Sequence, residues 1–121
     1  MPNVLEIPMK GEYDVYDITH EISKYAKENN VQNGIIIVYS KDPLVRFITI
    51  EYDADLLLDF KKLLSEIAGD NRFLKASILS PSITIPVING RLELGSFQQI
   101  VVLDLNEREG MRKICFLAVE Y

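Results

Sequence analysis

Short runs of strand-type residues, separated by turns, fill most of this chain of 121 residues and constrain its fold more than any other feature. Runs rich in Val, Ile, Phe and Tyr that end at Gly, Pro or Asn predict β-strands joined by tight connections. The predicted strands are residues 4–8, 12–17, 35–39, 45–51, 74–79, 82–87, 92–94, 97–105 and 112–120. We expect the first two to form a hairpin.

The segment 35–39 is the most informative of these runs, because every residue in it is apolar. An unbroken apolar run is typical of a strand that is covered on both faces. Residues 45–51 follow across a loop at Lys41-Asp42-Pro43 and are the expected pairing partner of this strand.

One helix is predicted between Asp17 and Asn30, where apolar residues recur at three- and four-residue spacing. Thr19 can accept hydrogen bonds from the free amides of the first turn, and Asn29 and Asn30 tolerate the left-handed backbone that ends a helix. The buried stripe is expected to consist of Ile18, Ile22, Tyr25 and Ala26.

A second helix is predicted over residues 54–68 from the same spacing. Asp53 or Asp55 is expected to cap its start, and Gly69 lies just past its end. Its repeating apolar positions are Leu56, Phe60, Leu63, Leu64 and Ile67.

The order of these elements is ββ-α-ββ-α followed by four or five strands. With no repeat or linker visible, this order predicts a single α+β domain over residues 1–121, with two helices at one side of an antiparallel β-sandwich.

Charge and composition exclude several classes of protein. The chain has 13 Lys and Arg against 18 Asp and Glu, a net charge of −5, which would repel a nucleic-acid backbone and an anionic membrane surface. No apolar stretch approaches the roughly 20 residues that span a bilayer, and no signal peptide is apparent, so a cytoplasmic location is expected. Cys115 is the only cysteine and is expected to be a buried strand residue.

Residues 74–98, which read LKASILSPSITIPVINGRLELGSFQ, resemble the characteristic stretch of the YjbQ-like family. The family pattern is close to Leu-Lys-Ala-Ser-Leu-Leu-Gly-Pro-Ser, then a Thr-x-Pro-Val strand and a Leu-Gly-Thr-Trp-Gln turn. Lys10-Gly11, Asp17-Ile18-Thr19 and Gly34 extend the resemblance over nearly the whole chain. It implies a small α+β sandwich that assembles as a homotrimer, and for some members a weak thiamine-phosphate synthase activity.

The chain departs from the family pattern at its histidines. The family's His-Thr-Thr motif after the third strand is replaced by Ser40-Lys41-Asp42-Pro43, and its His-x-His pair before Leu-Lys by Asn71-Arg72-Phe73. Imidazole is both a common metal ligand and a proton shuttle near neutral pH. We therefore expect no metal site and no cofactor. His20, the only histidine, is expected to be a solvated residue at the start of a helix.

The family motif retains four polar residues that are candidate ligand-binding groups. These residues are Lys75, Ser77, Ser82 and Gln98. A lysine and two hydroxyls could hold a phosphate or a carboxylate. Equally, the hydroxyls could satisfy backbone groups and the lysine could be a solvated strand residue.

Two carboxylates are candidate catalytic bases, Glu51 and Asp42. Glu51 also belongs to an acidic group with Asp53 and Asp55 that could coordinate a hard cation, although capping of the following helix is the favoured interpretation.

The leading functional hypothesis is a non-catalytic homotrimer with a binding or structural role that has lost the family's histidine site. The alternative is a weak enzyme acting on a small phosphorylated metabolite, with Lys75 and Ser77 holding the anion and Glu51 or Asp42 as the base. A third hypothesis is a mixed trimer with a histidine-retaining paralogue.

Overall fold

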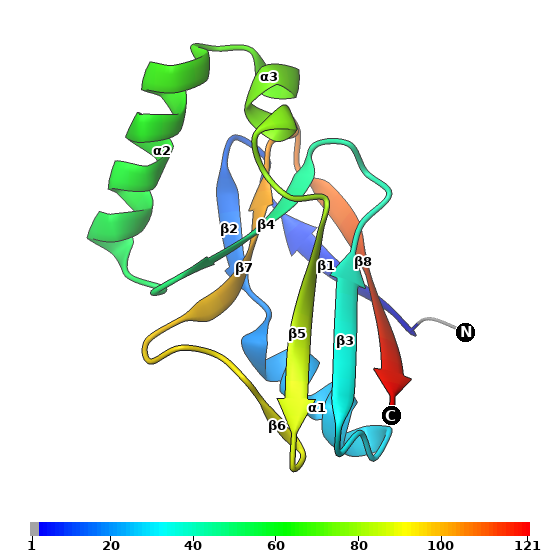
Figure 1. Cartoon of the computed structure of the whole chain (residues 1–121). Helices are drawn as coiled ribbons and strands as arrows, with labels where there is room; N and C mark the ends of the chain where they lie inside the picture. Colours follow the sequence, from blue (N-terminus) through cyan, green and yellow to red (C-terminus); the bar gives the residue numbers. More distant parts are fainter. Residues whose placement is uncertain (1–2) are drawn as a thin grey trace.

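The computed structural model describes residues 3–121, which form three helices and eight strands (Figure 1). In chain order these are β1 (Asn3–Met9), β2 (Asp14–Asp17), α1 (Thr19–Glu28), β3 (Gly34–Tyr39), β4 (Val45–Ile50), α2 (Ala54–Ala68), α3 (Arg72–Ser77), β5 (Ser82–Ile88), β6 (Arg91–Leu92), β7 (Gln99–Asp104) and β8 (Gly110–Glu120). The predicted α+β class is therefore confirmed. No helix in the described part of the chain is long and apolar enough to cross a membrane.

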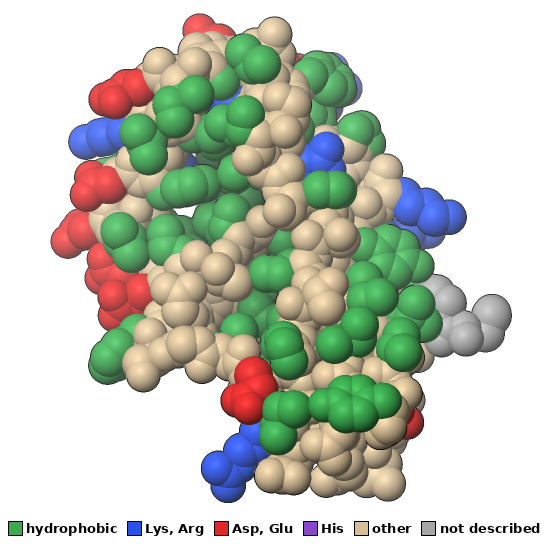
Figure 2. Space-filling view, viewed as in Figure 1, with side chains coloured by type: hydrophobic (Ala, Val, Ile, Leu, Met, Phe, Trp, Pro, Cys, Tyr) green, Lys and Arg blue, Asp and Glu red, His purple; other side chains and the backbone are tan. Residues whose placement is uncertain are grey.

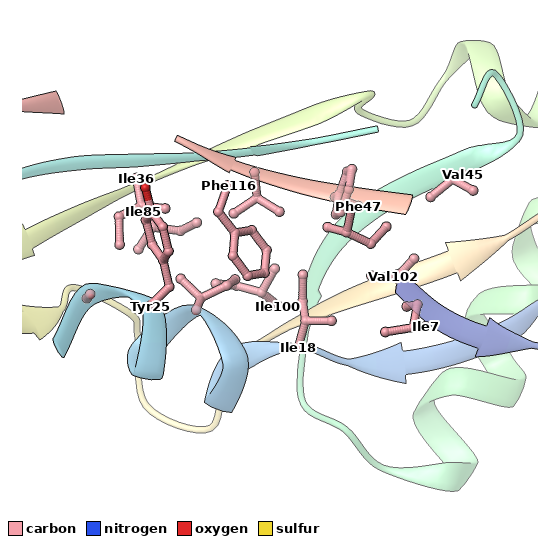
Figure 3. Close-up of a cluster of buried hydrophobic side chains, with 14 of the residues drawn as sticks. Ile7, Ile18, Tyr25, Ile36, Val45, Phe47, Ile85, Ile100, Val102 and Phe116 are labelled. Atoms are coloured by element: carbon pink, nitrogen blue, oxygen red, sulfur yellow. The ribbon is translucent and has the colours of Figure 1, made fainter. Parts of the chain in front are cut away.

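The strands form two antiparallel sheets that share one core. The larger sheet has the order β1-β8-β3-β5-β6, and the smaller has the order β2-β7-β4. Alternate side chains of both sheets point into one shared core, where Figure 3 shows Ile36 and Ile85 of the larger sheet beside Tyr25 of α1, and Phe47 and Val102 of the smaller sheet farther along the same cluster. Burial of these side chains is the main stabilising contribution to the sandwich.

The helices lie on two different sides of this sandwich, not on one side as the sequence predicts. Helix α1 packs into the shared core through Ile22, Tyr25 and Ala26, as expected from its spacing. Helices α2 and α3 cover the outer face of the smaller sheet, where Leu64 of α2 and Ala76 of α3 join a second buried cluster with Leu103 and Leu105. Strand β7 is consequently buried on both faces.

Capping at the helix starts is partly as predicted. Asp53 caps α2 by accepting from the amide of Leu56 at 2.9 Å, and Gly69 follows the helix with a φ of 63°. Thr19 does not cap α1; its hydroxyl accepts from the amide of Ile100 at 2.9 Å. Thr19 therefore attaches the start of α1 to β7.

The predicted strand pairings were wrong at two places. Strands β1 and β2 do not form a hairpin, because β1 pairs with β8 and β2 pairs with β7. Gly11, Glu12 and Tyr13 all have positive φ in the connection, and this bend carries the chain from one sheet to the other. Similarly, β3 pairs with β5 and β8, whereas β4 pairs with β7.

The segment predicted as a strand over residues 74–79 is instead mostly helix α3. The side chain of Asn71 accepts from the amide of Leu74 at 3.0 Å and so caps the helix. The Asn71 cap and the helix-forming residues Lys75 and Ala76 favour a helix in this segment. Their preference outweighs the strand preference of Ile78 at its end.

The apolar stripe of α2 is in the predicted place, but only part of it is buried: Leu64 is fully buried and Phe60 is half-buried. The helix contacts the protein through Leu57, Leu64 and Ala68. Leu56, Leu63 and Ile67 keep 41%, 51% and 62% of their surface exposed. A helical repeat defines which residues share a face, but tertiary contacts decide how much of that face is covered.

The outer face of the larger sheet is apolar and uncovered in the single chain. In β3 the inward residues are fully buried, whereas Ile35, Ile37 and Tyr39 point outward and are only half-buried. Leu117 and Val119 of β8 lie directly beside Ile37 and Ile35. We call these five residues the sheet patch, and Figure 2 shows hydrophobic side chains gathered over β3, β5 and β8.

Candidate functional site

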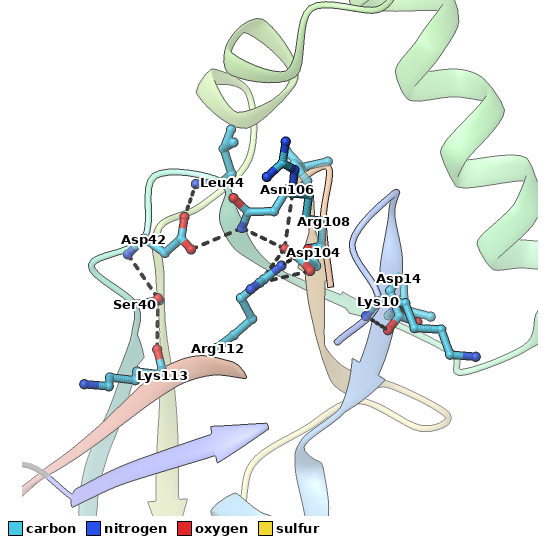
Figure 4. Close-up of polar contacts among 12 residues, drawn as sticks. Lys10, Asp14, Ser40, Asp42, Leu44, Asp104, Asn106, Arg108, Arg112 and Lys113 are labelled. Atoms are coloured by element: carbon cyan, nitrogen blue, oxygen red, sulfur yellow. Dashed lines mark hydrogen bonds and ion pairs between the residues drawn. The ribbon is translucent and has the colours of Figure 1, made fainter. Parts of the chain in front are cut away.

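Four polar residues meet at one end of the sandwich, where the loops after β3 and β7 approach the start of β8 (Figure 4). Asp104 accepts from the side-chain amide of Asn106 at 2.9 Å, and both of its oxygens accept from Nε of Arg112 at 3.1 Å. The same Asn106 amide donates to Asp42 at 3.1 Å. We call Asp42, Asp104, Asn106 and Arg112 the polar cluster.

The ion pair between Asp104 and Arg112 is the electrostatic centre of the cluster. Asp104 is fully buried, and the Arg112 side chain keeps only 10% of its surface exposed. Arg112 also donates from Nη2 to the backbone carbonyl of Arg108. A buried pair of this kind is tolerated because each charge is hydrogen-bonded as well as paired.

The loop after β3 is held against β8 by a short chain of hydrogen bonds. The Ser40 hydroxyl donates to the carbonyl of Lys113 at 3.0 Å and accepts from the amide of Asp42 at 3.2 Å. Asp42 in turn accepts from the amide of Leu44 at 2.9 Å. Both carboxylate oxygens of this candidate base are therefore engaged within the protein.

Two surface hollows of about 440 Å³ each flank the polar cluster. The β3-side hollow is lined by Ser40, Lys41, Asp42, Arg112, Lys113 and Cys115, among others. The α3-side hollow is lined by Arg72, Phe73, Asn106, Arg108 and Arg112, among others. Residues 40–43 and 71–73, the two segments where the family resemblance leads one to expect histidine motifs, lie at the same end of the molecule.

Arg72, in one of these two segments, is bound to three neighbours. It donates to the carbonyl of Leu105 at 2.8 Å and to Glu12 at 2.7 Å, and it lies 3.6 Å from Glu107. Burial has the largest single effect and lowers the pKa of Arg72, but the hydrogen bond and charge of Glu12, together with Tyr13 and Glu107, raise this pKa above its ordinary value. The guanidinium therefore stays charged and fixes the start of α3 against the turn after β1.

Lys75 lies away from both hollows and is almost completely buried, with 1% of its surface exposed. Its ammonium donates to the hydroxyl of Tyr13 at 2.6 Å and to Ser65 at 3.3 Å, and it lies 4.4 Å from the centre of the Tyr13 ring. Lys75 is thus neither a solvated strand residue nor a group that faces the hollows. Its contacts join α3 to α2 and to the bend before β2.

The other candidate residues do not gather around Lys75. Ser77 is exposed at the end of α3 and donates to the carbonyl of Leu74 at 2.6 Å. Ser82 and Gln98 are exposed in β5 and before β7, and Glu51 is exposed before α2. Of the proposed site residues, only Asp42 lies in the polar cluster.

We expect Lys75→Met to keep the free energy of unfolding within about 1.5 kcal/mol of the wild type, because methionine preserves most of the volume of the buried stem. The ammonium is paired only with neutral hydroxyls, so no buried counter-charge is left behind. Urea unfolding monitored by circular dichroism measures this. A loss of more than 3 kcal/mol would contradict it.

Sequence reasoning missed Asp104, Asn106 and Arg112. The available signal was a carboxylate inside the apolar run Ile100-Val101-Val102-Leu103-Asp104-Leu105. A charged residue in a fully buried strand needs a partner, and Arg112 is the nearest basic residue beyond Arg108. Within residues 3–121, no three His, Cys, Asp or Glu side chains are grouped so that they could hold a metal ion.

Comparison with known proteins agrees with this architecture. A family model described as UPF0047 protein YjbQ-like matches residues 3–120. The chain belongs to the YjbQ family.

A UPF0047 protein of Methanothermobacter thermautotrophicus is 29% identical to this YjbQ chain, over 84% of this chain and 81% of the relative. A solved structure of a YbjQ-like protein of unknown function from Sulfolobus solfataricus superimposes with a TM-score of 0.93 at 17% identity, covering 100% of this chain and 97% of that one. A hypothetical protein from Aeropyrum pernix K1 gives 0.90 at 21% identity, covering 100% and 99% of the two chains. At these identities the structures establish the fold.

Proposed function

We propose that this YjbQ chain is a non-catalytic protein that acts as a homotrimer in a binding or structural role. The observation that carries the proposal is the polar cluster, which occupies the end where the family's histidine motifs are replaced. Both oxygens of Asp42 and both oxygens of Asp104 accept hydrogen bonds from within the protein. Both carboxylates are thus held by donors of the protein itself, and Asp104 is fully buried, which favours a structural role over that of a general base.

Self-association is supported by the sheet patch. Ile35, Ile37, Leu117 and Val119 form a continuous apolar surface on the two central strands of the larger sheet. Val119 is 49% exposed. Large contiguous apolar surfaces on soluble proteins mark interaction sites, and homo-oligomer interfaces are the most apolar of these.

We expect the wild type to be a trimer and Ile37→Lys to be a monomer, because a lysine at the centre of the sheet patch would place a charge in an apolar contact. Sedimentation velocity of both proteins measures this. Gln32→Lys, the same introduced charge at an exposed loop residue, should remain trimeric. A wild type that is monomeric at high concentration would rule out the homotrimer.

A second candidate function is binding or weak turnover of a small phosphorylated metabolite, for which the family resemblance suggests thiamine phosphate. The observation that favours it is the β3-side hollow, where the ammonium groups of Lys41 and Lys113 border one space beside Asp42; Arg112 also lines this hollow but is paired with Asp104. Clustered cationic donors are the usual means of holding a phosphate.

Titration calorimetry with inorganic phosphate and with thiamine monophosphate, together with an assay for thiamine phosphate formation, separates the two functions. The non-catalytic proposal expects no turnover. Phosphate binding that is lost in Lys113→Ala and kept in Lys75→Met would support the second candidate. Turnover that requires Asp42 would overturn the first.

A further inference from the structure

The shared core opens to the surface near the start of β1, where a hollow of about 180 Å³ lies between β1 and α1. We call it the β1–α1 hollow. Its lining residues come from β1, from α1 and from Phe116 of β8, and they include no residue of the sheet patch or of the polar cluster. It is therefore a separate surface feature from those described above.

The apolar wall of this hollow consists of Leu5, Tyr25 and Phe116. The rings of Tyr25 and Phe116 lie 5.5 Å apart between centroids and are tilted by 59°, and Figure 3 shows both side chains between α1 and the larger sheet. Leu5 is half-buried against the same core cluster. This wall favours a ligand with an apolar body, because binding removes apolar surface of both molecules from water.

Glu21 of α1 brings a carboxylate with one unused oxygen to the hollow. Its Oε1 accepts from the hydroxyl of Tyr16 in β2 at 3.1 Å. Its Oε2 is shielded from solvent and accepts no hydrogen bond from any residue between 3 and 121. Burial, together with the hydrogen bond to Glu21, raises the pKa of Tyr16, so the phenol keeps its proton and remains the donor. A buried acceptor without a donor is rare in folded proteins, and it indicates a place for a donor group.

The charges around the hollow favour a cationic donor. Lys24 lies 3.7 Å from Glu28 in an exposed ion pair on α1, so these two charges offset each other. Glu21 forms no ion pair within the described part of the chain, and its hydrogen-bond partner is a neutral phenol. It lies in the first turn of α1, where the helix dipole favours a charged carboxylate. An ammonium group provides both the positive charge and the N–H donors that this carboxylate lacks.

We propose that the β1–α1 hollow binds a small primary amine with an apolar body, whose ammonium group donates to Oε2 of Glu21 while the body packs against Leu5, Tyr25 and Phe116. The volume restricts the ligand to a small molecule, because drug-sized ligands occupy pockets of about 300–1,000 Å³. The inference does not depend on the homotrimer or on the non-catalytic role proposed above.

Titration of the ¹⁵N-labelled wild type with three related compounds, followed by amide chemical shifts, tests this site. Benzylamine is the expected ligand type, benzyl alcohol keeps the ring without the charge, and benzyltrimethylammonium keeps the charge without N–H donors. We expect benzylamine to bind at least about tenfold more tightly than either, as a hydrogen bond to a charged group implies. The largest shifts are expected at Leu5, Glu21 and Phe116.

Two variants identify the carboxylate that is responsible. Glu21→Gln keeps the side-chain size and an acceptor for Tyr16 but removes the charge, so the preference for benzylamine over benzyl alcohol should be lost. Glu28→Gln removes a carboxylate that is 59% exposed on the same helix and should keep the preference. Circular dichroism verifies that both variants are folded.

Three results would overturn the proposal. Equal affinity of the wild type for benzylamine and benzyl alcohol would mean that water suffices for Oε2 of Glu21. Shifts confined to another surface, or a preference for benzylamine that survives in Glu21→Gln, would assign the binding elsewhere. If Glu21→Gln fails to fold, the three titrations of the wild type still decide the question, because they need no variant.

Discussion

Asp104→Ala is expected to lower the free energy of unfolding by about 3–5 kcal/mol, because it leaves the largely buried Arg112 without its counter-charge. Asp104 accepts four hydrogen bonds, two from Arg112 and two from Asn106, and its own surface is completely buried. Removing the carboxylate deprives three donor groups of their acceptor at once. Loss of one partner of a buried pair is far more costly than loss of a surface pair.

Urea unfolding at one fixed protein concentration measures this effect, since self-association would otherwise change the apparent stability. Glu109→Ala removes an exposed carboxylate from the same loop and is the matched control, with an expected change within about 0.5 kcal/mol. If Asp104→Ala and Glu109→Ala were equally stable, the polar cluster would not hold this end of the fold together.

Gly34→Ala is expected to cost at least about 3 kcal/mol, because a methyl group at this position collides with the backbone of β8. An ideal Cβ would lie 2.1 Å from the carbonyl oxygen of Val119 and 2.9 Å from Cα of Glu120. Backbone atoms cannot rotate away as a flexible side chain can. The substitution must therefore separate β3 from β8, which form the centre of the larger sheet.

Thermal and urea unfolding of Gly34→Ala, compared with Gly95→Ala, test this expectation. At Gly95 the added methyl group meets only Cγ of the Gln98 side chain, at 3.3 Å, which can move. The Gly95 variant should stay within about 0.5 kcal/mol of the wild type. A variant of Gly34 too unstable to purify would agree with the expectation, provided that Gly95→Ala is obtained normally, whereas a Gly34 variant of wild-type stability would refute it.

Features that depend on neighbours in the sequence were predictable. The spacing of apolar residues located α1 and α2, Asp53 was identified as a cap, and Cys115 was expected to be a buried strand residue. Each of these depends on contacts within one or two turns of a helix or on the alternation of one strand. The order of the predicted elements gave the α+β class, the family resemblance agreed with it, and the structure confirms it.

The candidate site could not be derived in the same way. Lys75 and Ser77 are close in the sequence, yet Lys75 is buried against Tyr13 and Ser77 is exposed at the end of α3. Arg112 and Asp42 are far apart in the sequence, yet both line the β3-side hollow. Long-range strand pairing determines which of these distant residues become neighbours. A single sequence does not show which strands pair.

The sequence by itself determined the α+β class, most of the strands and the two longer helices. These properties follow from local propensity and residue identity. Only the tertiary structure decided that β1 and β2 belong to different sheets, that α3 replaces a predicted strand, and that Asp104 is neutralised by Arg112. It also decided which apolar surfaces remain uncovered, because the burial of a residue depends on what the rest of the chain places over it.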